Sequence, residues 1–569
     1  MDAMQKMLEM YKQQLVRQFD ECSVPVVCAI GQSGETTVTM DDGVKLRTMY
    51  WKPEGKEGFP VILLRSCYPN QEPVLVVKAE QVCRRGFGVV LQWCRGTGGS
   101  EGEWEPNIYD RADGLATMRW LDQMDEVESI GYWGDSYLAY TGWCMADAVP
   151  DKCKTMYLGV YGCDRHVSAY QDGLFRQDIL TGWAMGNAGR PIEADYIASC
   201  RYHPQVEVDE ALWGIRLDWY RDWITNTDRD SEYWSQGLWR KLRETPSEMK
   251  IPVFIRDGWY DHHLGSAIAT YRSLSPESRA HTTLQLGPWN HSYGCALTGQ
   301  DTANLKDDSI ESPMAWFKRI LLDGENPPPE VQTYVCGKDE WECWNQFPVP
   351  VSEYRTLYLD AAGTKKEDAY RLGNAPAENN AQVSYRYDPD DPVLSFGAES
   401  LFVSQGGVGS LRQPPCSWRK DILSFLSPVF TEDTELGGSI KVRLYVSSDA
   451  PDTAFAAKVM EVLPNGTTYN IRGSITTLAY RGHSEHRQSY TPGQIVEVEI
   501  DTWEISWMFK AGSRLRVDVT SSDFPQYSIH PNKEGPWSVH KDVVPAIQTV
   551  YTGKDYPSAV ILPVVYPQK

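Results

Sequence analysis

The most constraining feature of this chain is a serine placed between a buried strand and a helix. Residues 134–138 are Gly-Asp-Ser-Tyr-Leu; the apolar run 129–133 before them predicts a strand, and residues 137–148 predict a helix. A serine on such a turn has the layout of a nucleophile elbow, where the helix N-terminus faces developing negative charge. The usual second glycine is missing, since Ala139 stands near that place. A turn without catalytic function therefore remains the alternative for Ser136.

Two strand ends downstream carry the partners that a serine nucleophile needs. The run 251–256 predicts a strand followed by Asp261, and the run 282–286 predicts another followed by His291. An orienting acid and a base in the chain order Ser, Asp, His are typical of α/β-hydrolases. Asp257 is a competing acid, and a solvated carboxylate or a structural histidine are the non-catalytic alternatives. Three residues in this order, each after a strand, favour a catalytic triad.

Several longer motifs follow the same order as in a known family. They are Arg-Gly-x-x-x-Ser-x-Gly at 95–102, Gly-x-Ser-Tyr at 134–137, Trp-Tyr-Asp at 259–261 and Gly-Pro-Trp-x-His at 287–291. From about residue 38 onward the chain resembles the cocaine esterase-like (CocE/NonD) hydrolases. That family is related to X-prolyl dipeptidyl peptidases and α-amino-acid ester hydrolases. Because the motifs are long and well spaced, the resemblance is specific.

The resemblance implies a role for each motif residue. Ser136 corresponds to the nucleophile, His291 to the general base and acid, and Asp261 to its orienting partner. The oxyanion hole would use the backbone N–H of Tyr137 and the hydroxyl of Tyr68, which follows the predicted strand 60–64. The family's chemistry needs no metal and no organic cofactor, so we expect none.

Two positions depart from the family's usual pattern. Asp135 lies beside the nucleophile, where relatives often have a small or apolar residue; we expect it to cap the helix. The alternative is that its charge raises the pKa of His291. Trp93 stands where an aspartate is common, which concerns the local loop and not the triad.

The chain order predicts an α/β fold in several parts. We expect an amphipathic helical extension at residues 1–30 and a discontinuous α/β-hydrolase domain at 31–150 and 250–350. Residues 151–249, polar and rich in tryptophan, predict a helical cap inserted between nucleophile and acid. Residues 351–569 show short alternating strands, and the resemblance makes them a jelly-roll β-sandwich.

Composition excludes several classes of partner. The formal net charge of −22 and the pI near 5.0 leave no basic surface for nucleic acid, and they disfavour anionic membranes. A cationic substrate would suit this charge, although net charge alone does not show it. The 13 cysteines have no metal-ligand spacing, and no apolar run spans a bilayer. We therefore expect free thiols and a cytoplasmic protein; the N-terminal helix and sandwich surfaces allow a homodimer.

The predicted activity is cleavage of a carboxylic ester of a small aromatic or alkaloid-like substrate through an acyl-enzyme on Ser136. Trp183, Trp259 and Trp289 are the candidate substrate contacts, and the alternative is that such tryptophans fill cores. Because such a triad can catalyse acyl transfer in general, two other hypotheses about the activity remain. One is an amide-directed acylase or X-prolyl dipeptidyl peptidase, and the other is an acyltransferase or cyclising biosynthetic enzyme.

Overall fold

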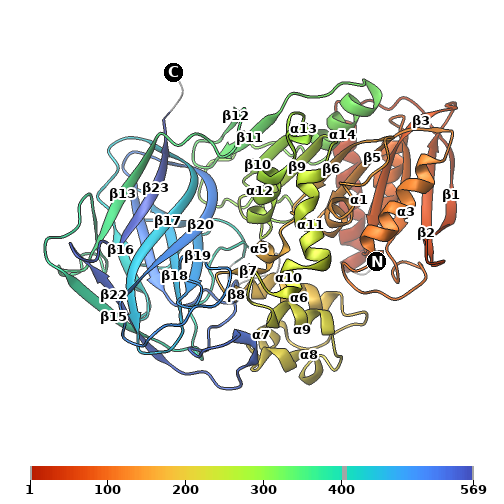
Figure 1. Ribbon diagram of the computed structural model, residues 1–569. Helices are drawn as coiled ribbons and strands as arrows, with labels where there is room; N and C mark the ends of the chain where they lie inside the picture. The colour runs from red at the N-terminus through yellow and green to blue at the C-terminus, as the bar shows by residue number, and fades with distance from the viewer. Residues whose placement is uncertain (1–2, 400–406, 567–569) are drawn as a thin grey trace.

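The computed structural model describes residues 3–399 and 407–566, which form two large β-sheets side by side with a helical segment below (Figure 1). The first sheet carries the elbow. Its strands, in spatial order, are β1 (Ile30–Thr39), β2 (Lys45–Pro53), β4 (Gly88–Trp93), β3 (Phe59–Ser66), β5 (Val127–Asp135), β6 (Cys153–Gly159), β9 (Val253–Gly258), β10 (Thr283–Gly287), β11 (Glu330–Val335) and β12 (Glu340–Trp344). The strands from β4 to β11 are parallel, and the outer strands β1, β2 and β12 pair antiparallel.

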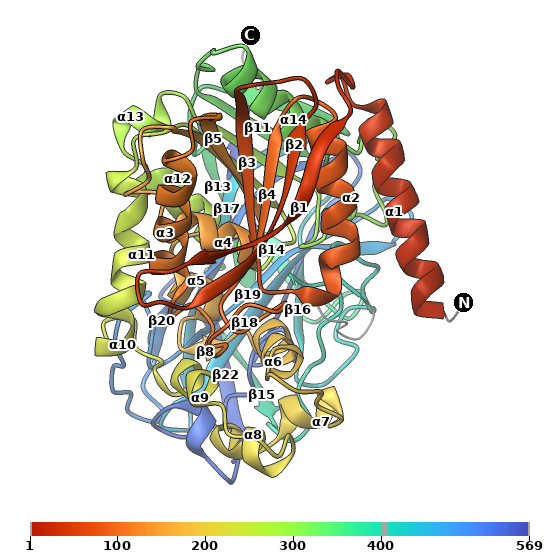
Figure 2. The same cartoon turned by 90° about the vertical axis from the view of Figure 1, so that its right-hand side faces the viewer.

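Helices cover both faces of this sheet, which explains why its central strands are continuous apolar runs. On one face lie α1 (Ala3–Glu21), α2 (Glu72–Cys83) and α14 (Glu311–Phe317); on the other lie α3 (Asp110–Asp122), α4 (Tyr137–Trp143) and α12 (Leu264–Ser273) (Figure 2). Strand β3 serves both cores: Ile62 packs in the cluster on the α2 side, and Leu63 packs in the cluster on the α4 side.

The N-terminal helix α1 lies against the body of the protein. Leu15 and Phe19 are buried in the same cluster as residues of α2 and α14. The Gln18 amide donates to Asp307 at 2.5 Å, so the helix is held by polar as well as apolar contacts. The amphipathic pattern predicted for this segment therefore reflects docking on the hydrolase sheet.

The segment between β6 and β9 forms the helical part below the sheet. Its helices are α5 (Arg165–Ala169), α6 (Gln177–Gly186), α7 (Tyr196–Arg201), α8 (Val208–Ala211), α9 (Asp218–Thr225), α10 (Glu232–Ser235) and α11 (Gly237–Glu248). Helix α11 runs back beside the sheet and packs on α4 and α12. Strand β6 falls inside the range 151–249 assigned to the cap, yet it pairs with β5 and β9, so the inserted segment begins after it.

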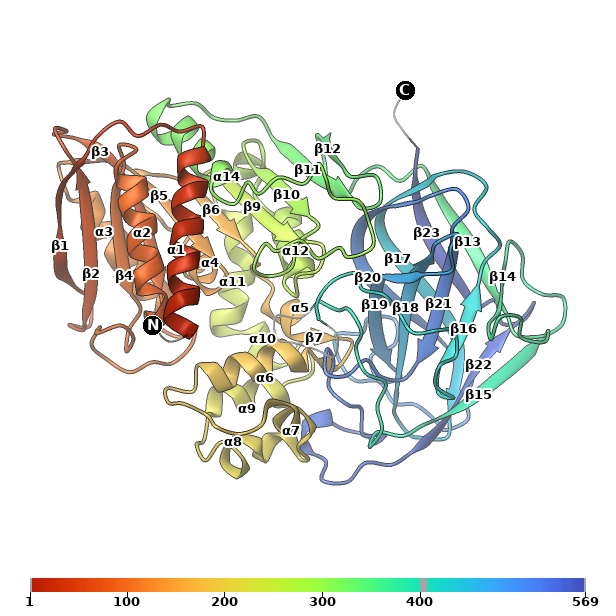
Figure 3. The same cartoon turned by 180° about the vertical axis from the view of Figure 1, so that it is seen from behind.

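The C-terminal half is a β-rich domain that packs beside the first sheet (Figure 3). Its strands are β13 (Glu353–Asp360), β14 (Tyr370–Gly373), β15 (Ala381–Tyr387), β16 (Leu423–Leu426), β17 (Thr434–Ser448), β18 (Ala454–Val462), β19 (Thr468–Thr477), β20 (Val496–Phe509), β21 (Arg514–Thr520), β22 (Ala546–Thr552) and β23 (Ala559–Val565). Along β17, Ile440, Val442 and Leu444 are buried and alternate with partly exposed residues. The predicted fold class, an α/β-hydrolase domain with a C-terminal β-sandwich, is confirmed.

Other sequence expectations concern cysteines and membranes. All 13 cysteines are free thiols, and most are buried. In residues 3–399 and 407–566, no helix combines the length and the apolar character needed to cross a membrane.

Candidate active site

Ser136 sits on a sharp turn between β5 and α4. Its backbone has φ 58° and ψ −126°, a conformation that non-glycine residues avoid and that strained catalytic turns use. Gly134 is required here, because a Cβ at that position would lie 2.2 Å from the carbonyl oxygen of Leu138. Ala139 is fully buried where the family usually has glycine, and its backbone N–H donates to the Ser136 carbonyl at 2.9 Å. The elbow therefore forms without the second glycine.

The structure brings Ser136, His291 and Asp261 together from three strand ends. His291 Nε2 lies 2.8 Å from the Ser136 hydroxyl, and His291 Nδ1 lies 2.5 Å from Asp261 Oδ2. Asp261 is fully buried, and its other oxygen accepts the backbone N–H of His263 at 2.6 Å. A carboxylate on Nδ1 fixes the imidazole tautomer in which Nε2 accepts the serine proton.

Tyr68 lies where an oxyanion donor would be needed. Its hydroxyl neighbours the Ser136 hydroxyl, and burial raises the pKa of Tyr68 well above its ordinary value. The Trp183 indole N–H donates to the Tyr68 oxygen at 3.1 Å. Because that bond occupies a lone pair, the Tyr68 proton stays available for a substrate oxyanion.

Tyr137 supplies the second predicted donor through its backbone. It is the first residue of α4, so its N–H has no partner within the helix. Two hydrogen bonds hold its side chain in place. The hydroxyl donates to Asp110 at 2.6 Å and accepts from the backbone N–H of Asn107 at 2.7 Å. The Tyr137 ring also stacks on Trp183 at 5.9 Å between centroids.

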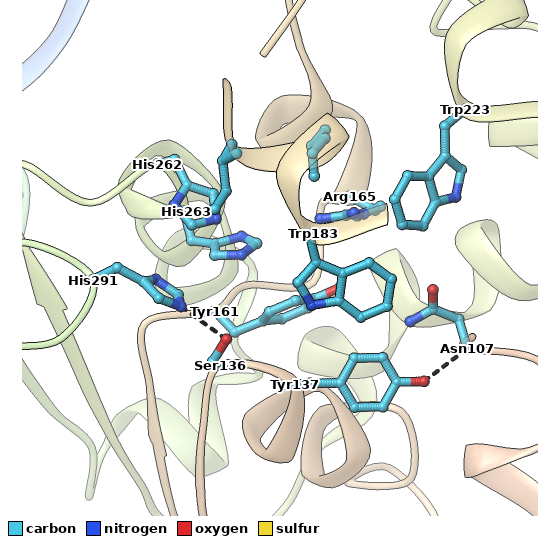
Figure 4. A pocket seen from close by; sticks show the side chains of 12 residues that line it. Asn107, Ser136, Tyr137, Tyr161, Arg165, Trp183, Trp223, His262, His263 and His291 are labelled. Atoms are coloured by element: carbon cyan, nitrogen blue, oxygen red, sulfur yellow. Dashed lines mark hydrogen bonds between the residues drawn. The ribbon is translucent and has the colours of Figure 1, made fainter. Parts of the chain in front are cut away.

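The pocket next to Ser136 is lined mainly by aromatic and apolar side chains (Figure 4). Tyr161, Trp183 and Trp223 line it, and Ile179 and Leu180 of α6 add aliphatic surface. Four of these residues, Ile179, Leu180, Trp183 and Trp223, come from α6 and α9 of the inserted helical segment, which therefore covers Ser136. This placement is typical of a site for a small, flat, apolar group.

Of the three tryptophans proposed as substrate contacts, only Trp183 is among the residues lining this pocket. Trp259 is buried elsewhere and donates through its indole N–H to the Tyr334 carbonyl at 2.8 Å. Trp289 packs on Trp341 and lies under the Arg256 guanidinium at 4.1 Å. Both are buried, and neither lines the pocket beside Ser136.

In the described part of the chain, Asp135 neither caps α4 nor forms a hydrogen bond with His291. Its Oδ1 accepts the hydroxyl of Tyr293 at 2.6 Å, and α4 begins without a side-chain cap. Gly159 makes room for this contact, since a Cβ there would lie 1.9 Å from the Tyr293 hydroxyl. Asp135 therefore ties the elbow to the loop that carries His291.

Sequence reasoning missed two histidines at the site. His262 and His263 follow Asp261 directly and line the pocket, with ring centroids 4.7 and 5.8 Å from that of His291. Burial lowers the pKa of both well below the ordinary value, so both are neutral. Their adjacency to Asp261 was the available signal. No signal in the sequence indicated that Asn107 and Arg165, which lie on other parts of the chain, would line the pocket.

Among the described residues, Asp261, His262 and His291 offer ligand atoms within 4.8 Å of one another, which is close enough for a metal ion. Both ring nitrogens of His291 are already engaged, one by Asp261 and one by Ser136. A metal bound through either nitrogen would displace the hydrogen bond that this nitrogen makes, so the arrangement as it stands suits proton transfer.

Comparisons with known proteins agree with this geometry. A family model described as X-Pro dipeptidyl-peptidase (S15 family) matches residues 42–293, and one for the X-Pro dipeptidyl-peptidase C-terminal non-catalytic domain matches residues 323–561. Cocaine esterase from Rhodococcus sp. (strain MB1 Bresler) is 29% identical over 93% of this chain and 97% of its own length. The chain is similar to cocaine esterase over nearly its whole length, and its two domains match the two X-Pro dipeptidyl-peptidase family models. The resemblance found in its motifs is thus confirmed.

Solved structures share the fold of this chain over nearly its whole length. An aminopeptidase from a marine sediment archaeon, Thaumarchaeota archaeon, superposes with a TM-score of 0.79 at 20% identity, covering 95% of this chain and 97% of its own. An α-amino acid ester hydrolase gives a TM-score of 0.77 at 21% identity, covering 95% and 98%. At this identity the likeness establishes the fold.

Proposed function

We propose that this protein is a serine hydrolase that cleaves carboxylic esters of small aromatic compounds through an acyl-enzyme on Ser136. The observation that carries the proposal is the chain of hydrogen bonds from Asp261 through His291 to Ser136, at 2.5 and 2.8 Å. Ser136 and His291 both line a pocket with aromatic walls. A nucleophile, its base and the orienting acid are thus assembled at a place where a substrate can bind.

The proposed reaction has two halves, formation and hydrolysis of the acyl-enzyme, and the same groups act in both. His291 accepts the Ser136 proton as the serine oxygen attacks the ester carbonyl, and Asp261 stabilises the imidazolium. The tetrahedral oxyanion accepts hydrogen bonds from the Tyr68 hydroxyl and the Tyr137 backbone N–H. His291 then gives its proton to the leaving alcohol, and water repeats the sequence to release the acid.

The lining of the pocket supports an aromatic substrate. Trp183 and Trp223 have ring centroids 5.7 Å apart, and Tyr137 stacks on Trp183. Faces of this kind bind flat apolar groups with little loss of side-chain entropy, because the rings are already packed. The expectation of an alkaloid-like substrate finds less support, since no carboxylate among the described residues lines the pocket to pair with a protonated amine.

A panel of p-nitrophenyl esters, with Gly-Pro-p-nitroanilide alongside, tests the proposal on the wild type and on Ser136→Ala. We expect release of p-nitrophenol from aryl-acyl and short acyl esters, no dipeptide release, and loss of turnover in the variant. Dipeptide release by the wild type would move the activity to the X-prolyl peptidase branch. Turnover that needs an added amine or alcohol would instead indicate an acyltransferase.

A further inference from the structure

Arg165 brings an unpaired positive charge into the pocket beside Ser136. It is the first residue of α5, it lines the pocket, and it is only 7% exposed. Its Nε is buried without a hydrogen-bond partner, and its guanidinium forms no hydrogen bond or ion pair with the described residues. Figure 4 shows the guanidinium beside the Trp223 ring, on the pocket side of the helix.

The nearest carboxylate along the chain does not neutralise this charge. Asp164 caps α5 by accepting the Val167 N–H at 3.3 Å, and it pairs with Arg229. Trp223 lies 4.7 Å from the Arg165 guanidinium carbon, which stabilises one face of the cation. A ring face accepts none of the five N–H groups in the guanidinium plane, so this contact leaves them free.

The other pocket walls contain no anion that could serve as a counter-ion. His262 and His263 are neutral, and no aspartate or glutamate lines the pocket among the described residues. Asn107 adds a second donor: its side-chain amide lines the pocket and forms no hydrogen bond with the described residues. Burying an unpaired cation is unfavourable, and a bound anion would offset that cost.

We propose that Arg165 binds a carboxylate on the substrate, so that the preferred esters carry a negative charge in addition to their apolar part. The proposal rests on ester hydrolysis at Ser136 and names its substrate class. It opposes the expectation of a cationic substrate drawn from the net charge of −22. The lining of the pocket outweighs that overall charge, because a contact in a buried pocket is screened far less than one across the surface.

Two matched pairs of substrates test the proposal and locate the charge. p-Nitrophenyl hydrogen adipate and its methyl ester place the carboxylate on the acyl side, with a chain too long for rapid attack on its own ester. p-Acetoxybenzoate and its methyl ester place it on the alcohol side. We expect the charged member of at least one pair to have a kcat/KM about tenfold higher, the scale of one hydrogen bond to a charged group.

Arg165→Met removes the charge and keeps an apolar side chain, and Arg165→Lys keeps a charge. We expect Arg165→Met to lower kcat/KM for the preferred charged ester by about 10- to 100-fold, a larger factor than for the matched neutral ester. Arg165→Lys should keep part of the preference. Arg240→Met, which removes an exposed arginine on α11, is the matched control and should leave both substrates within about twofold.

Neutral fluorophosphonate labelling of each variant separates this proposal from the proposed function. Normal labelling of Arg165→Met shows that its catalytic site is intact. If the labelled wild type prefers both methyl esters, or if Arg165→Met keeps the acid preference, the carboxylate proposal is overturned while esterase activity stands.

If the wild type neither labels nor cleaves, the proposed function fails. Binding then decides the carboxylate proposal: p-hydroxybenzoate or adipate should raise the melting temperature of the wild type and not of Arg165→Met, and no shift would overturn it.

Discussion

The indole N–H of Trp183 donates a hydrogen bond to the phenolic oxygen of Tyr68 across 3.1 Å, linking the inserted helices to the predicted oxyanion hole. Trp183 lies on α6, whereas Tyr68 follows β3 of the hydrolase sheet. Because the indole only donates, Tyr68 keeps its own proton for the oxyanion. The inserted segment therefore orients the predicted oxyanion donor as well as covering the pocket.

Variants of Tyr68 and Trp183 test whether this contact matters for turnover. Tyr68→Phe should lower kcat by about 100- to 1,000-fold, because it removes one oxyanion donor. Trp183→Phe should lower kcat by about 3- to 10-fold, since Tyr68 loses a partner that orients it. In the double variant the second substitution should cost almost nothing further. A double-mutant cycle on kcat measures this coupling, and additive effects would contradict the positioning role.

Two neighbouring acids, Asp257 near the end of β9 and Asp261 just after it, should differ sharply in their effect on kcat. Asp261→Asn should lower kcat by about 10,000-fold, since the amide no longer fixes the His291 tautomer. Burial and the neighbouring Asp261 raise the pKa of Asp257 well above its ordinary value, which favours the neutral carboxyl. Asp257→Asn should accordingly keep kcat within about threefold of the wild type. A large loss in Asp257→Asn, with Asp261→Asn mild, would reassign the orienting acid.

The elbow depends on a glycine before the nucleophile. Gly134→Ala should abolish turnover and lower the melting temperature, because its Cβ would lie 2.2 Å from the Leu138 carbonyl oxygen. Gly363→Ala is the matched control, since an added Cβ there meets nothing within 4 Å. Activity assays and thermal unfolding of both variants check this. Full activity in Gly134→Ala would mean that the turn does not have the described geometry.

One contact between the inserted segment and the β-sandwich should make stability depend on pH. A hydrogen bond with Asp172 raises the pKa of His483 from 6.5 to about 9. The folded state therefore holds this proton more tightly than the unfolded state, so the stabilisation is complete below pH 6.5 and is lost as pH rises through 9. Because His483 is partly exposed, screening reduces the effect to about 1 kcal/mol.

Denaturation midpoints measured across that pH range check the assignment. The difference in midpoint between the wild type and His483→Gln should shrink as pH rises through the pKa of His483. A constant difference would show that the charge of His483 does not contribute. His486, an exposed histidine facing Asp230, offers a control, since His486→Gln should have a smaller effect across the same range.

Much of the triad's placement could be predicted because α/β sheets put functional residues after strands. Ser136, Asp261 and His291 each follow a buried apolar run, and in a parallel sheet those ends meet at one edge. Local sequence is enough for such residues. The same reasoning assigned Trp259 and Trp289 to the pocket, because proximity in sequence to catalytic residues does not fix which way a side chain points.

The pocket itself could not be predicted in the same way. Arg165, Trp183 and Trp223 come from separate helices of the inserted segment, whose packing depends on contacts distant in sequence. Asp135 shows the same limit: its partner Tyr293 lies 158 positions away, so no local pattern could separate this bond from helix capping. Substrate preference therefore depends on tertiary contacts that periodicity does not encode.

Covalent labelling would show whether Ser136 is an activated nucleophile, on which the proposed reaction depends. The wild type and Ser136→Ala would be treated with a fluorophosphonate and analysed by intact-protein and peptide mass spectrometry. We expect one phosphonyl group per chain, on the peptide containing Ser136, and none in the variant. An unlabelled wild type, or an adduct on another residue that persists in Ser136→Ala, would contradict this expectation.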